Sequence, residues 1–127
     1  MGDSDKSGAP AAGAAPAAGP VGLVVVDAGV CGYKATIRAE RTAGYNVRLQ
    51  IETDCPHVSK IAPEPLEVDA VRQIGLRAGL PSLLVDAYAC CAHAACVVPS
   101  ALVKAVEVAA GLALPADVSM KISKGSS

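Results

Sequence analysis

The chain has 127 residues, a formal net charge of −1 at pH 7 and three aromatic residues, all of them tyrosine. A chain of this length builds one compact domain around one core. A charge near zero, with no block of Lys or Arg and few rings on which bases could stack, is atypical of nucleic-acid-binding proteins. The most apolar segment, residues 97–114, contains Pro99, Lys104 and Glu107, which disfavours a membrane span. We expect a soluble protein that contacts neither nucleic acid nor membrane.

Residues 1–20 consist largely of Ala, Gly and Pro. Such a segment cannot bury enough apolar surface to offset its chain entropy. We therefore expect a disordered tail over 1–20, one domain over 21–123 and a flexible tail over 124–127. The chain starts with acidic and small residues rather than the basic start and apolar run of a secretory signal, which predicts a cytoplasmic protein.

Apolar and polar residues alternate over 33–40 and again over 45–52, which predicts the two strands of an antiparallel hairpin. A three-residue loop that ends in a left-handed Gly44 would place Ile37 opposite Leu49. Extending this register places Cys31 opposite Cys55 on the core-facing side. Directly opposed side chains have Cβ atoms about 4.5–5.5 Å apart, so both sulfurs could reach one metal centre.

The run Cys55-Pro56-His57 follows the second strand, and its proline suits the start of a short helix over 57–61. A thiol beside a helix N-terminus tends to have a lowered pKa, which favours the thiolate. Apolar residues at helical spacing predict a further helix over 67–78, with Gly79 as its stop.

A helix starting at Ser82 would place Cys91 on the apolar face, Cys90 at the edge of that face, and His93 and Cys96 beyond it. Pro99 disfavours helix at the residue before it, so the backbone could unwind after His93 and redirect Cys96. Cys31, Cys55, Cys91 and Cys96 are therefore the candidate ligands of one buried metal site.

The end of the chain adds a helix over 100–110, bounded by Pro99 and Gly111, and an alternating segment over 118–122. We expect that segment to form an edge strand beside the hairpin. The predicted fold is α+β, with a small antiparallel sheet, made of the hairpin and the C-terminal strand, packed against three helices. The predicted order is β-β-α-α-α-β.

Four sequence features occur together: Gly29-Val30-Cys31-Gly32, Cys55-Pro56-His57, the run Cys91-x-His93-x-x-Cys96-x-x-Pro99-Ser100, and residues 107–115. In this combination the chain resembles, over most of residues 22–122, a family of small proteins of unknown function found mainly in anaerobic prokaryotes. The resemblance selects Cys31, Cys55, Cys91 and Cys96, treats Cys90 as an addition, and favours iron and sulfide through its anaerobic setting. It implies a metal site but no reaction.

Five cysteines in a chain without an export signal favour reduced thiols, and an odd number leaves one unpaired in any full disulfide scheme. The leading hypothesis is a [4Fe–4S] or [2Fe–2S] cluster serving electron transfer, cluster carriage or docking to a protein partner or a second copy. One alternative is a zinc-stapled interaction module, with His57 or His93 as a possible further ligand. Another is a thiol enzyme or sulfur carrier that uses Cys55.

Each residue also has a structural explanation. A free cysteine is often a small core side chain, and Cys90 and Cys91 are the most prone to be that. His57 can cap its helix, and His93 can be an ordinary surface residue. The spacing matches neither zinc knuckles nor the closely spaced ferredoxin run. No nucleophile, base and orienting group occur in a recognisable order, so independent catalytic activity is not expected.

Overall fold

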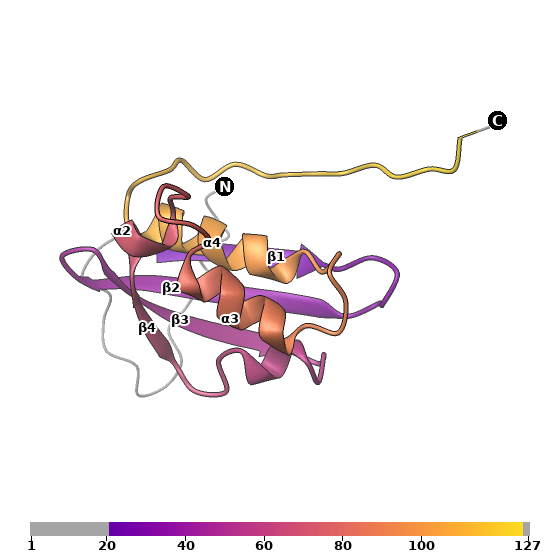
Figure 1. The fold of residues 1–127 in the computed structure, drawn as a ribbon, viewed down its shortest axis with the longest axis horizontal. Coiled ribbons are helices and arrows are strands. Elements are labelled where there is room, and N and C mark those ends of the chain that lie inside the picture. Colours follow the sequence, from indigo (N-terminus) through magenta and orange to yellow (C-terminus); the bar gives the residue numbers. More distant parts are fainter. Residues whose placement is uncertain (1–20, 126–127) are drawn as a thin grey trace.

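The computed structural model describes residues 21–125 (Figure 1). Its elements in chain order are β1 (Val21–Asp27), β2 (Lys34–Ala43), β3 (Asn46–Thr53), the 3-10 helix η1 (Val58–Lys60), β4 (Leu66–Asp69), α2 (Ala70–Gln73), α3 (Ser82–Cys90) and α4 (Val98–Ala109). The tail predicted over 1–20 and the last two residues of the tail predicted over 124–127 lie outside the described residues. Within residues 21–125, no helix is long and apolar enough to cross a membrane.

The four strands form one antiparallel sheet in the order β1-β2-β3-β4. Helices α3 and α4 lie over one face of this sheet, and α4 packs mainly across β1 and β2 (Figure 1). The core side chains of the hairpin are the odd-numbered residues of the predicted alternation, and Ile37, Val47 and Leu49 are completely buried. The predicted hairpin and its two faces are therefore confirmed.

The predicted order β-β-α-α-α-β is wrong, because four strands precede the longer helices. The predicted helix over 67–78 is instead the strand β4 followed by the one-turn helix α2. Residues 118–122 form no strand. The physical reason lies in the sheet, because β1 occupies the free edge of β2 and β4 occupies the free edge of β3. The hairpin therefore offers no edge for a C-terminal strand of the same chain.

The register of the hairpin is also different from the prediction. Ile37 pairs with Ile51 rather than with Leu49, and Leu49 pairs with Ala39. The shift arises at the turn, where Ala43 pairs with Asn46 and the ladder is irregular between residues 41 and 43. A shift of two residues keeps every side chain on its predicted face, because side chains alternate with a period of two.

Two contacts hold the helices in place, one between α4 and the sheet and one between two helices. Gly22 of β1 lies so close to α4 that a Cβ there would meet the carbonyl oxygen of Ala105 and lie 3.2 Å from the backbone nitrogen of Ala109. The second contact links α2 to α3, because the buried Gln73 side chain accepts a hydrogen bond from the backbone N–H of Leu83 at 2.9 Å. That bond satisfies one of the free N–H groups at the start of α3.

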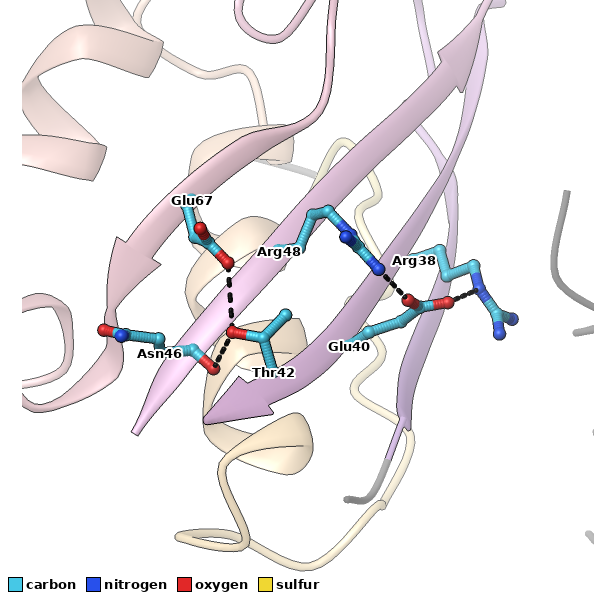
Figure 2. Close-up of polar contacts among 6 residues, drawn as sticks. All are labelled: Arg38, Glu40, Thr42, Asn46, Arg48 and Glu67. Atoms are coloured by element: carbon cyan, nitrogen blue, oxygen red, sulfur yellow. Dashed lines mark hydrogen bonds and ion pairs between the residues drawn. The ribbon is translucent and has the colours of Figure 1, made fainter. Parts of the chain in front are cut away.

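The sheet face opposite the helices carries a polar network (Figure 2). Glu40, only 2 % exposed, accepts hydrogen bonds from Arg38 Nε at 2.8 Å and from Arg48 Nη2 at 2.9 Å. Burial works to raise the pKa of Glu40, but the bonds and positive charges of Arg48 and Arg38 outweigh it and hold the pKa below the ordinary 4.5. Nearby, the Thr42 hydroxyl lies 3.0 Å from Glu67 Oε2 and joins β2 to β4. Glu40 is therefore paired with one arginine of its own strand, β2, and with one of the neighbouring strand, β3.

Candidate cysteine-lined site

Four of the five cysteines line one cavity of about 220 Å³. Three separate parts of the chain line the cavity: the turn between β1 and β2 with the start of β2, the end of β3 with η1, and the loop between α3 and α4. Its cysteine and histidine lining residues are Cys31, Cys55, His57, Cys91, His93 and Cys96. All four cysteines selected from the sequence therefore border the same space, and Cys90 is not among the lining residues.

Cys55 is the most deeply placed of the five, with 9 % of its surface exposed. The hydroxyl of Thr53 accepts a hydrogen bond from the Cys55 backbone N–H at 3.1 Å and donates one to the carbonyl of Lys34 at 2.7 Å. These bonds fasten the end of β3 to the start of β2. The backbone N–H of Val58 lies 3.5 Å from Cys55 Sγ and donates a hydrogen bond to it. The sulfur is therefore held against the first residue of η1.

Cys91 and Cys96 lie at the two ends of the loop that connects α3 to α4. Helix α3 ends at Cys90, and Cys91 has extended backbone angles, φ −74° and ψ 149°. The expectation that Cys91 lies within a longer helix is therefore wrong, although the chain does turn away before Cys96. The Cys96 backbone N–H closes the loop with a 3.3 Å hydrogen bond to the carbonyl of His93.

Helix α4 begins directly after this loop, at Val98, two residues earlier than predicted. Pro99 lies in the first turn of α4, where the missing N–H costs no hydrogen bond. The proline is therefore part of the helix start, and the residue before it, Val98, is helical rather than excluded from the helix as predicted. Cys96 is therefore redirected by the loop alone.

The thiols of this region interact. Burial, a hydrogen bond with the Cys96 side chain and the negative charges that Cys96, Cys90 and Cys55 carry when ionised together raise the pKa of Cys91 to about 12. Cys91 is thus a neutral thiol at neutral pH in the metal-free protein. The same interactions show that Cys55, Cys91 and Cys96 lie near one another, although they come from two distant parts of the sequence.

Cys31 reaches the cavity in a different way from the one predicted. Strand β2 begins at Lys34, so Cys31 is not in the hairpin and does not face Cys55 across it. It lies instead in an exposed turn closed by a 2.8 Å hydrogen bond from the Gly32 N–H to the Gly29 carbonyl. Both glycines have positive φ, 85° and 77°, which other residues adopt with difficulty. Cys31 therefore lies at the rim of the cavity.

His57 and His93 are both exposed and both border the cavity, whereas Cys90 is partly buried beside it. Among residues 21–125, no group of three or more His, Cys, Asp or Glu side chains is placed to hold a metal ion as the chain stands. Ligation would require the side chains around the cavity to rotate toward one another.

Thr53 was not singled out from the sequence, although it positions Cys55. A Thr hydroxyl often accepts a hydrogen bond from the backbone N–H two residues later, so the Thr-x-Cys spacing was the available signal. Tyr33 and Lys34 also line the cavity, and neither was singled out as a site residue.

Comparison with known proteins gives one match. The model of a family of unknown function, DUF6951, matches residues 23–122, which covers every described strand and helix except the first two residues of β1. No curated protein and no solved structure matches the chain. The resemblance noted above to a family without an assigned function is thereby confirmed, and its cysteine pattern and anaerobic setting stay expectations. The chain belongs to the DUF6951 family of unknown function.

Proposed function

We propose that this protein binds an iron–sulfur cluster through Cys31, Cys55, Cys91 and Cys96, and that it serves in electron transfer, cluster carriage or docking to a protein partner. The observation that carries the proposal is that these four cysteines, from three separate parts of the chain, border one cavity. Free cysteines that serve only as core side chains have no reason to gather around one space.

The size of the cavity leaves room for a group larger than a single ion. Its volume of about 220 Å³ is several times the roughly 30 Å³ that a water molecule occupies in the liquid. A zinc ion draws four ligands to within about 2.3 Å of one point. An iron–sulfur cluster binds each thiolate through a different part of a larger body, so its ligands stand farther apart.

The electrostatics of the site also suit a cationic group. Burial and neighbouring thiols keep Cys91 protonated in the metal-free protein. Positively charged iron would offset both effects, so binding would release protons and become tighter as pH rises. The N–H of Val58 already points at Cys55 Sγ, and hydrogen bonds to ligand sulfurs are one means by which proteins set the reduction potential of a cluster.

The test is anaerobic reconstitution with iron and sulfide, followed by visible absorption and by iron and sulfide analysis. We expect stoichiometric cluster in the wild type and a several-fold lower content after replacing Cys55, Cys91 or Cys96 by Ser. Cys90→Ser is the matched control, because Cys90 adjoins Cys91 in sequence and does not line the cavity. A colourless product without bound iron and sulfide, or equal losses in the control, would refute the proposal.

A zinc-stapled interaction module is the second candidate, and His57 and His93 favour it because both border the same cavity. Zinc accepts mixed thiolate and imidazole ligand sets. Under this alternative the purified protein would be colourless, contain about one zinc per chain and lose stability in a chelator. Replacing both histidines by Gln would then lower zinc affinity, whereas it would leave a cluster held by four cysteines in place.

Thiol chemistry at Cys55 is a weaker candidate, because that residue is only 9 % exposed and a substrate could approach its sulfur only through the cavity. The N–H of Val58 that donates to its sulfur is the observation in its favour. Under this alternative Cys55 would be alkylated faster than the other four cysteines of the metal-free protein, and slow alkylation would exclude it.

A further inference from the structure

Strand β1 has the sequence of an interior strand but lies at the edge of the sheet. Residues 21–26 read Val-Gly-Leu-Val-Val-Val, with no polar side chain on either face. Strands of this composition are typically paired on both sides, and edge strands usually carry charges, proline or a bulge that prevent further pairing. Among the described residues β1 pairs only with β2, and Val25 is 70 % exposed.

The opposite edge of the sheet does have such protection. Strand β4 is only four residues long, and its two exposed residues, Glu67 and Asp69, are charged. A short, acidic edge strand is a poor template for another strand. Within residues 21–125, the open edge that remains is therefore that of β1.

The C-terminal segment, residues 118–122, has the sequence of a strand but no sheet. Val118, Met120 and Ile122 alternate with polar residues and are 64 %, 68 % and 88 % exposed. The segment is drawn out and, in the view of Figure 1, runs along the domain clear of the helices and the sheet. An alternating apolar pattern left in water is unfavourable for an isolated chain, because it exposes surface that pairing would bury.

We propose that these two features complete each other between two copies of the chain. Residues 118–122 of one copy add a fifth strand along the outer edge of β1 in the second copy, and the exchange is reciprocal. The seven residues of β1 are long enough for the five residues of the segment. A reciprocal exchange between identical chains is self-complementary and closes as a dimer, without leaving an open edge for further addition.

The geometry of α4 supports this exchange. The end of α4 lies beside the start of β1, since Ala109 is the neighbour of Gly22. Residues 110–113 are held at the end of α4 by backbone hydrogen bonds to the carbonyls of Val106, Glu107 and Val108, so the free connector is residues 114–117. Fully extended, these four residues span up to about 13 Å from a point near the start of β1. That length reaches an adjoining β1 edge of a second copy. The matched family region, residues 23–122, includes both β1 from its third residue and the whole segment.

The test measures the mass of the full-length protein by light scattering across a range of concentrations. We expect a dimer for the wild type. We expect a marked shift to monomer for Met120→Pro, because proline removes a backbone donor and restricts φ within the added strand. Gly125→Pro is the matched control, because it places a proline beyond the alternating segment, and it should remain dimeric. The helical circular dichroism signal near 222 nm should be the same for all three, because Met120 lies outside every helix and outside the sheet of its own chain.

Amide hydrogen exchange supplies the second measurement. In the wild type, residues 118–122 should exchange slowly, and the Met120→Pro variant should lose that protection. A wild type that is monomeric at every concentration, a dimer that Met120→Pro leaves intact, or fast exchange at 118–122 within the dimer would each overturn the proposal. The exchange does not depend on the cluster, so iron content after reconstitution should be equal in the wild type and in Met120→Pro.

Discussion

Replacing Gly22 by alanine tests how closely the sheet and α4 must approach. The new Cβ would meet the carbonyl oxygen of Ala105 and lie 3.2 Å from two further backbone atoms, Ala105 C and Ala109 N. Backbone atoms cannot rotate away as a flexible side chain can. Helix α4 would therefore have to move off β1, and with it the buried residues that α4 places against the sheet, such as Leu102.

The expected cost follows from two opposing effects. Forcing an additional methyl group into a packed core typically costs about 1–3 kcal/mol, and contact with backbone places this site near the upper value. Alanine in a strand regains about 0.5–1 kcal/mol relative to glycine. The free energy of unfolding should therefore fall by about 2 kcal/mol, which in a domain of this size lowers the melting temperature by about 10 °C.

Urea unfolding followed by circular dichroism measures this difference, with Gly75→Ala as the matched control. A Cβ at Gly75 would have no atom within 4 Å, and the residue has no positive φ. Gly75→Ala should therefore leave stability unchanged or raise it by up to about 1 kcal/mol. If Gly22→Ala unfolds at the same urea concentration as the wild type, the close approach of β1 to α4 is not a constraint on the fold.

Two further predictions concern titrating groups. In reduced, metal-free protein Cys91 should stay largely unreactive toward iodoacetamide at pH 9, because its pKa is raised to about 12. Cys96→Ala should speed the alkylation of Cys91, because it removes both a hydrogen bond and an ionisable neighbour. Equal alkylation rates at Cys91 with and without Cys96, mapped by mass spectrometry, would contradict this. Glu40 has a pKa held below 4.5, so it stabilises the fold above that pH and this contribution is lost as pH falls through the lowered pKa. Glu40→Gln should therefore flatten the fall in stability below pH 4.5, and unfolding curves as steeply pH-dependent as those of the wild type would contradict the paired role of Glu40.

The sheet was predictable where the sequence alternates and not where it does not. Residues 34–52 show period-two alternation, and the hairpin forms there with the expected faces. Strand β1 shows no alternation of apolar and polar residues, because apolar residues fill both of its faces. Strand β4 has only four residues, and its apolar residues fit the same helical spacing as Val71 and Ile74, so the sequence pattern does not distinguish it from a helix. Residues 118–122 alternate but form no strand within the chain. Alternation indicates which side chains a strand could bury, but it does not indicate whether a sheet edge is free to pair with that strand.

The candidate site was predictable in its members but not in its geometry. Cys55 lies where its strand-Cys-Pro context indicated, at the end of β3. Cys31 lines the cavity from a glycine-bounded turn instead of from the strand that the register argument required, and Cys91 does so from the residue after a helix instead of from the helix itself. Turn and helix ends depend on tertiary packing, so sequence spacing could indicate the cysteines but not the backbone that carries them.

The side-chain amide of Gln73 connects the packing of α2 against α3 to the position of the cysteine-lined cavity at the other end of α3. Helix α3 has nine residues and rises about 13 Å from its start to its end. Because Gln73 anchors the first turn of α3 at Leu83, it contributes to the position of the whole helix, and Cys91 directly follows the last residue of that helix. A substitution at this glutamine would therefore alter the spacing of the thiols without touching any of them.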